Sequence, residues 1–197
     1  GGVYRLKETL TFGLEDSAPE GHTVRYKAYQ DEEPVLTSTE LISGWKKLTS
    51  FPSDLPIVAQ GNVWVANIEN AKNWQFRTLF DGEKMLSRAR SAGFVPTMEC
   101  PAPSLAHRWE DLNTLGFPEG ALRNWDNLED VEIFIRPTHQ WLVNYLPIEK
   151  VDENKNIATT RVSGTYRLCK VVNKDWDETC WVENVLEAMD EPGEWVL

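Results

Sequence analysis

Apolar and polar residues alternate along most of the chain, and this period of two is typical of half-buried β-strands. The predicted strands share this alternation, or a short apolar run bounded by turn residues, and lie at residues 4–7, 23–29, 34–37, 62–67, 75–80, 85–90, 131–136, 142–148, 157–162, 166–171 and 180–186. No stretch longer than about two turns carries a helical stripe. The pattern therefore predicts an all-β chain whose helix content is well below the average of about one-third.

Residues with turn chemistry separate these strands. Asp81 and Gly82 form the strongest two-residue hairpin signal, because glycine reaches the positive φ angles that a tight turn needs. Pro192 and Gly193 predict a corner near the end of the sequence, since proline lacks the amide donor of a sheet ladder. Residues 91–119 contain four prolines and keep no period, so they form either a functional loop or a surface excursion.

Apolar character resumes after the Pro192–Gly193 corner, at Trp195, just where the sequence ends. We interpret residues 181–197 as the return of the chain to a larger body, and the sequence as a piece of a longer protein. An ordinary terminal strand docked in a sheet is the alternative interpretation.

The charge of the chain narrows the expected partners. Its 197 residues include 31 acidic and 20 basic residues, so the formal charge is −11. Such a chain repels phosphate backbones and anionic lipid head groups, and we expect neither nucleic acid nor a membrane surface as partner. No apolar run approaches the roughly 20 residues that span a bilayer, and the amino terminus lacks the pattern of a signal peptide. If the protein is exported, its signal lies upstream of Gly1.

The aromatic and cysteine contents add two expectations. Nine tryptophans are spread from Trp45 to Trp195, and one or two of their rings are expected to stack on a ligand, for which the apolar faces of sugars are well suited. The three cysteines are too few and too scattered for a zinc cluster or a disulfide framework. Cys169 and Cys180 flank a polar turn and can face each other on paired strands, with Cys100 apart; whether they form a disulfide depends on the compartment.

Two pairs of residues are candidate substrate contacts. His139 and Trp141 alternate, so in a strand an imidazole and an indole point the same way, as a sugar hydroxyl and its apolar face require. The alternative is a structural histidine beside a core tryptophan. Arg88 and Arg90 also share one face, and their forked donors suit a carboxylated or hydroxyl-rich ligand. The alternative is a pair of solvated or ion-paired arginines.

Motifs of several other classes of site are missing. The sequence has no glycine-rich phosphate loop, no Gly-x-Ser-x-Gly elbow and no His-Glu-x-x-His motif. The acidic residues within 187–194 lack the spacing and the glycine of a calcium loop. We therefore expect no metal site and no cofactor.

Several phrases, in order along nearly the whole chain, resemble those of bacterial right-handed parallel β-helix proteins that act on polysaccharides. These phrases are GGVYRL at residues 1–6, YKAY at 26–29, EPVL at 33–36, GWK at 44–46, FRTLFDG at 76–82, RAR at 88–90, HQW at 139–141 and VENVLEAMDEPGEW at 182–195. The set is most similar to the family 141 glycoside hydrolases and their relatives, which include α-fucosidases and xylanases. The resemblance implies the start of a β-helix at residues 1–44, an inserted sandwich-like or barrel-like β domain at 45–180, and the return to the β-helix at 181–197.

The resemblance also implies a function. The chain would be a fragment of an exported, secreted or periplasmic glycoside hydrolase, in which the insert lies beside the cleft for a polysaccharide or oligosaccharide. Glycoside hydrolysis needs two carboxyl groups flanking the scissile bond, and the resemblance implies that they lie downstream of Leu197, so the chain alone is expected to be inactive. The remainder of the polypeptide, or a second copy, is the expected partner of the open strands of residues 1–44. The alternative function is a non-catalytic carbohydrate-binding, structural or adhesin module.

Overall fold

A computed structural model describes residues 1–69, 76–100, 111–136, 141–171 and 180–197. In these residues the chain consists of short β-strands and coil, and its helices are limited to three 3-10 turns, at Leu14–Asp16 (η1), Leu128–Asp130 (η3) and Leu186–Ala188 (η4). The predicted all-β class and low helix content are thereby confirmed for the described part of the chain. The chain forms two compact units, one of Gly1–Trp45 with Ala66–Ile68 and one of Lys46–Val65 with Glu69–Leu197.

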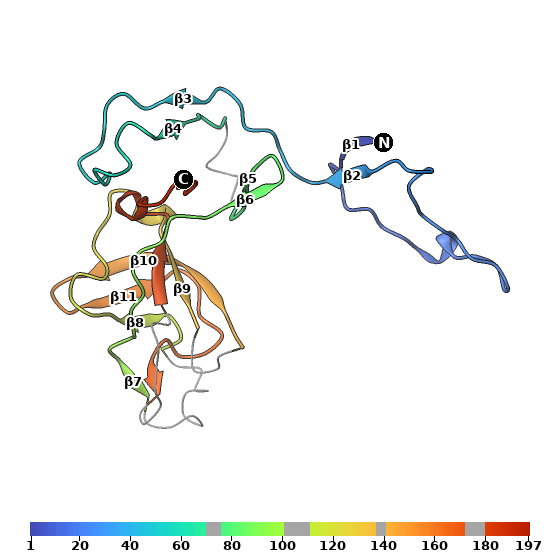
Figure 1. Cartoon of the computed structure of the whole chain (residues 1–197). Coiled ribbons are helices and arrows are strands. Elements are labelled where there is room, and N and C mark those ends of the chain that lie inside the picture. Colours follow the sequence, from blue (N-terminus) through green and yellow to red (C-terminus); the bar gives the residue numbers. More distant parts are fainter. Residues whose placement is uncertain (70–75, 101–110, 137–140, 172–179) are drawn as a thin grey trace. The chain divides into compact units, whose positions relative to one another are not determined.

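The first unit contains one pair of strands. Strand β1 (Gly2–Arg5) pairs in parallel with β2 (Pro34–Thr37), with Gly2 opposite Pro34 (Figure 1). A parallel pair needs a long connection, and here it runs through η1 and the residues up to 33. Every residue of this unit is described and none is buried.

The predicted strand at residues 23–29 is wrong, because no strand forms there. Its alternating tyrosines and basic residues lack a neighbouring strand to complete a hydrogen-bonded ladder, and alternation alone does not provide one. Tyr26 packs edge to face on Phe12 instead, with ring centroids 4.9 Å apart. An alternating local pattern therefore does not form a strand when no other segment pairs with it.

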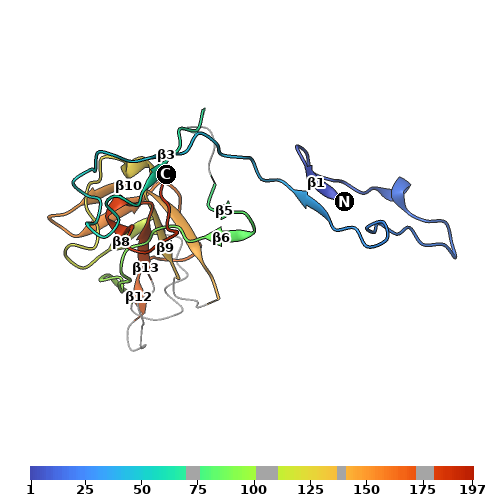
Figure 2. The same cartoon turned by 45° about the horizontal axis from the view of Figure 1, so that its top comes forward.

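The second unit is built on a five-stranded antiparallel sheet with the order β13-β9-β10-β11-β8. Strands β8, β9, β10 and β13 are labelled in Figure 2. Its strands are β8 (Thr114–Gly116), β9 (Glu132–Ile135), β10 (Asn144–Asp152), β11 (Ile157–Thr160) and β13 (Cys180–Glu183). Strands β9, β10, β11 and β13 match the predicted strands at 131–136, 142–148, 157–162 and 180–186, whereas β8 lies within residues 91–119, where no strand was predicted. The register of β10 with β11 shifts between Ile148 and Lys150, as in a β-bulge that bends the sheet.

One face of this sheet carries the hydrophobic core. Val131, Ile133 and Ile135 were predicted to share a face, and all three are fully buried there. They pack with the other apolar side chains of the cluster, which are Ala89, Phe94, Leu115, Phe117, Leu122, Leu146, Ile148, Val151, Ala158, Leu168, Cys180, Val182, Val185 and Ala188. The burial of this one face fixes which side chains of each strand point the other way.

Three short pairs complete the described strands. Strand β3 (Lys46–Lys47) pairs with β4 (Trp64–Val65), β5 (Leu79–Asp81) with β6 (Lys84–Leu86), and β7 (Glu99–Cys100) with β12 (Lys170–Val171). The β5–β6 pair confirms the hairpin predicted at Asp81 and Gly82. Its turn is formed by Gly82 and Glu83, and Gly82 has a φ of +60°.

The expectation that Cys169 faces Cys180 is wrong. Cys169 forms a disulfide with Cys100, which lies on β7 with Cα atoms 5.8 Å apart. Cys180 is buried on β13, where its backbone pairs with Ile135 on one side and Phe94 on the other. Sequence spacing could not reveal this disulfide, because it depends on the pairing of β7 with β12, and the two cysteines are 69 residues apart in the chain.

The predicted corner at Pro192 and Gly193 is confirmed, with a φ of +92° at Gly193. It turns the chain so that Trp195 pairs with Arg88 as a parallel bridge, and the Ala89 amide donates to the Trp195 carbonyl at 2.9 Å. On its other side the same segment pairs with β13 through Arg90 and Glu183. Residues 87–94 therefore extend the sheet beyond β13.

Candidate functional site

The face of the sheet opposite the core carries a compact group of charged and aromatic side chains. Because Val131, Ile133 and Ile135 point into the core, the residues between them point to the other side, and the strand register aligns the equivalent positions of β10 and β13. We call this side the outer face, and its central residues are Glu132, Phe134, Tyr145, Trp181 and Glu183.

A row of stacked rings crosses the outer face from strand to strand. Phe134 and Trp181 stack with centroids 3.7 Å apart and planes inclined by 7°, and Tyr145 meets Phe134 edge to face at 5.2 Å. Each end of the row is capped by an arginine, since the Arg90 guanidinium lies over Trp181 at 5.0 Å and the Arg77 guanidinium over Tyr145 at 5.4 Å. The rings and cations hold one another in place through cation–π and ring contacts.

A pair of carboxylates lies beside this row. Glu132 and Glu183 are directly opposite each other on β9 and β13, and both side chains accept from Arg88, which is 3.4 Å from Glu183. Arg77 also donates to Glu132, with its Nε atom 3.2 Å from Oε2. Trp181 donates from its indole to Glu183 at 2.8 Å. The two carboxylates are thus bound to arginine and indole donors.

The ionisation of this cluster follows from these contacts. Burial raises the pKa of Glu132, but hydrogen bonds from Arg77 and Arg88 outweigh it and leave that pKa below its ordinary value. Burial, followed by the negative charge of Glu183, raises the pKa of Tyr145. A carboxylate with a lowered pKa is a poor general acid at neutral pH, so Glu132 is suited to holding cations in place.

Trp195, near the carboxyl end of the sequence, packs against Arg88. Trp195 is buried, donates from its indole to the Leu86 carbonyl at 3.3 Å and stacks on Phe76 with centroids 5.3 Å apart. The Arg88 guanidinium lies 5.7 Å from the centre of the Trp195 ring. With Ala89 pointing into the core, Arg88 is therefore enclosed between Trp195 and the two glutamates.

The structure brings three of the four predicted site residues into view. Arg88 and Arg90 both lie on the outer face, but only 7% of the Arg88 side chain is exposed, and it forms the ion pairs described above. Arg90 is exposed. Trp141 precedes β10 and is 78% exposed. His139 lies outside the described residues.

Exposed apolar side chains lie at the start of β10 and in the residues just before it. Trp141, Val143 and Tyr145 are exposed to 78%, 50% and 40%, and they alternate with the buried residues Asn144 and Leu146. Of these three, only Tyr145 lies on β10, where it points to the outer face, and Trp141 and Val143 precede that strand. The outer face combines ring surfaces with cations.

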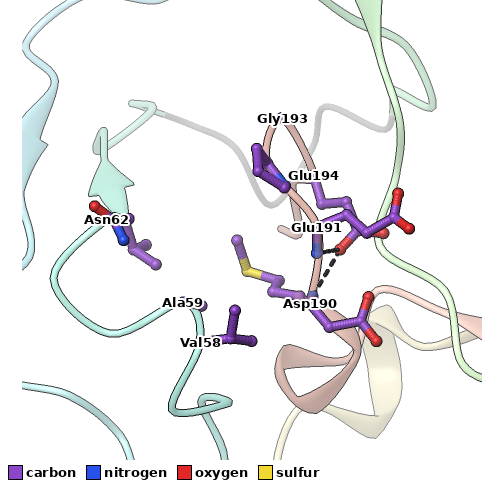
Figure 3. A pocket seen from close by; sticks show the side chains of 10 residues that line it. Val58, Ala59, Asn62, Asp190, Glu191, Gly193 and Glu194 are labelled. Carbon is purple, nitrogen blue, oxygen red and sulfur yellow. Dashed lines mark hydrogen bonds between the residues drawn. The ribbon is translucent and has the colours of Figure 1, made fainter.

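A separate cavity of about 410 Å³ lies elsewhere in the second unit (Figure 3). Val58, Val63 and Met189 supply apolar walls, and residues 190–194 supply the facing backbone. The Glu194 carboxylate accepts from the amides of Asp190 and Glu191 at 2.8 and 2.9 Å. The carboxylates of Asp190 and Glu191 point away from Asn62 in Figure 3, so they give this cavity no converging set of charged groups.

The described residues show neither a metal-binding cluster nor a membrane-spanning helix. No group of three or more histidine, cysteine or acidic side chains in the described residues is arranged to hold a metal ion. In the same part of the chain, no helix has the length and apolar character needed to cross a bilayer.

Comparison of the chain with models of protein families, with curated proteins and with solved structures finds no match. The outer face is therefore interpreted from its own residues. The sequence predicted Arg88 and Arg90 as substrate contacts, and the structure shows Arg88 in the ion-paired alternative. Glu132 and Glu183 were missed, although a glutamate between two buried apolar positions, as in Val131-Glu132-Ile133, is a signal for a paired carboxylate on the opposite face.

Proposed function

We propose that the chain is part of a polysaccharide-degrading β-helix glycoside hydrolase and supplies an inserted β domain whose outer face contacts the glycan. Residues 1–44 form the start of the β-helix, 45–180 the insert and 181–197 the return. The chain itself carries no catalytic acid pair in this proposal. The motifs that resemble the family 141 glycoside hydrolases motivate it, and the outer face is the observation that carries it.

The first unit supports the β-helix part of the proposal. In a β-helix each strand pairs in parallel with the strand one coil later, and β1 and β2 pair in parallel with an offset of 32 residues, from Gly2 to Pro34. Their apolar side chains are open to solvent, since Val3, Tyr4, Val35 and Leu36 are 49% to 61% exposed. Exposed strands of this kind need further chain to cover them, from the remainder of the polypeptide or from a second copy.

The second unit supports the insert. Its sheet is antiparallel, its register shifts between β10 and β11 as at a β-bulge, and one of its faces packs on the main hydrophobic cluster, as expected of a sandwich-like or barrel-like domain. Its outer face presents Tyr145 at one end of the ring row and Arg90, over Trp181, at the other end. Rings bind the apolar faces of sugars, and guanidinium groups donate to their oxygens.

The outer-face carboxylates argue against catalysis by this chain. Glu132 and Glu183 are both bound to Arg88, whereas a glycosidic acid must keep its proton at working pH and face the scissile bond. In the proposed enzyme, the catalytic pair lies on coils beyond Leu197.

The disulfide between Cys100 and Cys169 supports a secreted or periplasmic location. Disulfides persist in oxidising compartments and are rare in the cytosol. An exported protein is also what an enzyme that meets polymeric glycans requires.

Parallel assays of binding and turnover test the proposal. The chain is titrated with fucosylated and xylan-type oligosaccharides while its tryptophan fluorescence is followed, and the same mixtures are analysed for released sugars. Binding without hydrolysis is expected. Hydrolysis by this chain would refute the placement of the catalytic acids, and the absence of binding to any glycan would refute the proposed role of the outer face.

The second candidate is a non-catalytic carbohydrate-binding or structural module. It is favoured by one observation, which is that the facing carboxylates of the outer face are held as ion pairs. The enzyme and a carbohydrate-binding module both predict glycan binding by this chain, whereas a purely structural module predicts none. Assay of the intact gene product separates them, because only the enzyme releases sugar when the remaining coils are present.

A further inference from the structure

We infer that the outer face selects acidic sugars, and that Arg90 binds the carboxylate of a uronic acid residue. This inference rests on the proposed function, because it assumes that a glycan lies on this face. It adds the chemical class of that glycan.

Arg90 differs from the other two arginines of the outer face in its charge environment. Arg88 is paired with Glu132 and Glu183, and Arg77 is paired with Glu132. Arg90 is exposed, and among the described residues it forms no ion pair with a carboxylate. Three arginines against two glutamates leave one positive charge, and the pairing places that charge on Arg90. In a chain of net charge −11, this is a local site for an anion.

The Arg90 guanidinium is positioned by its contact with the Trp181 ring. It lies over the ring of Trp181, which is fixed by its stack on Phe134 and by its hydrogen bond to Glu183. A guanidinium supported on a ring keeps its donors available, and its planar fork matches the two oxygens of a carboxylate. Little side-chain entropy is then lost when the carboxylate binds.

The exposed rings nearby set the size of the ligand. Tyr145 lies on β10, two strands away from Trp181 on β13, which at the usual spacing is about 10 Å. Arg90 lies one segment further, beyond β13. A ligand that reaches both Arg90 and Tyr145 must therefore be an oligosaccharide. One of its sugar faces packs on the Tyr145 ring while one carboxylate reaches Arg90.

A matched pair of ligands tests the selection. The chain is titrated by calorimetry with tetragalacturonic acid and with its fully methyl-esterified form, in which the carboxylates are neutral, and with a neutral xylotetraose. We expect the acid to bind at least tenfold more tightly than the ester, and its affinity to fall with added salt. The Arg90→Gln variant should bind the acid about tenfold more weakly and leave the affinity for the ester unchanged.

Lys155→Gln is the matched control, because it also removes one positive charge but lies in the turn between β10 and β11. It should leave both affinities unchanged.

Equal binding of acid and ester, or binding of xylotetraose alone, overturns the acidic selectivity and leaves the proposed glycan binding intact. Failure of all glycans, including fucosylated ones, to bind overturns the proposed function as well. The comparison of acid with ester uses the unmodified chain, so it stands even if a variant fails to fold.

Discussion

Replacement of Arg88 by methionine is the most informative perturbation of the second unit. The side chains of Arg88, Glu132 and Glu183 are only 7%, 10% and 9% exposed, so the change leaves two carboxylates enclosed without their shared cation. Removal of one partner from a buried ion pair costs about 3–5 kcal/mol. Arg77 remains on Glu132, so we expect the lower end of this range, about 3 kcal/mol at pH 7.

The effect of Arg88→Met on the free energy of unfolding should depend on pH, because Glu132 is a titratable group. In the unmodified chain the pKa of Glu132 is lowered by Arg77 and Arg88, although burial opposes them, so its contribution to stability is present above the unfolded pKa and is lost as pH falls. Without Arg88, burial dominates and favours the protonated carboxyl. The variant is therefore penalised most at pH 7, and the difference in free energy of unfolding from the unmodified chain should shrink at pH 4.

Urea unfolding followed by tryptophan fluorescence measures this difference. With a slope of about 2 kcal/mol per molar urea, a loss of 3 kcal/mol lowers the midpoint by about 1.5 M. The triple variant Arg88→Met, Glu132→Gln and Glu183→Gln removes the charges together and should recover most of the loss, since neutral replacements of a buried ion pair are often tolerated. A midpoint for Arg88→Met within 0.3 M (about 0.6 kcal/mol) of the original at pH 7 would refute the enclosed-charge reasoning.

Three further predictions follow from individual contacts. Asn184 has a φ of +69°, donates to the Asp130 carbonyl at 2.8 Å and accepts from the Leu197 amide. Asn184→Ala should therefore lower the free energy of unfolding by about 2–4 kcal/mol. Asn184→Gly should lower it by less, because glycine tolerates the backbone angle. Thermal unfolding with and without reductant should show that the Cys100–Cys169 disulfide, which spans 69 residues, stabilises the chain by about 4 kcal/mol; an unchanged transition would contradict its formation. Gly82→Val should destabilise the β5–β6 hairpin by about 1–2 kcal/mol because of the φ of +60°, measurable by hydrogen exchange in that hairpin.

Local chemistry determined several features that were predictable from the sequence. The alternation around Val131, Ile133 and Ile135 predicted a strand with one buried face, because side chains of a strand point to opposite sides in turn. Gly82 and Gly193 marked the hairpin and the corner, since both positions require a positive φ. Arg88 and Arg90 were correctly assigned to one side of their segment.

Other features depended on which segments meet. The alternating residues 23–29 form no strand, because their local pattern is not matched by a partner, and Cys169 joins Cys100 across 69 residues. The sequence by itself determined the all-β class, the turns at Gly82 and Gly193 and the buried face of residues 131–135, since these follow from backbone sterics and side-chain period. Only the tertiary structure placed Glu132 opposite Glu183 and enclosed Arg88 between them, because strand register is decided by the burial of a shared core and not by neighbours in the chain.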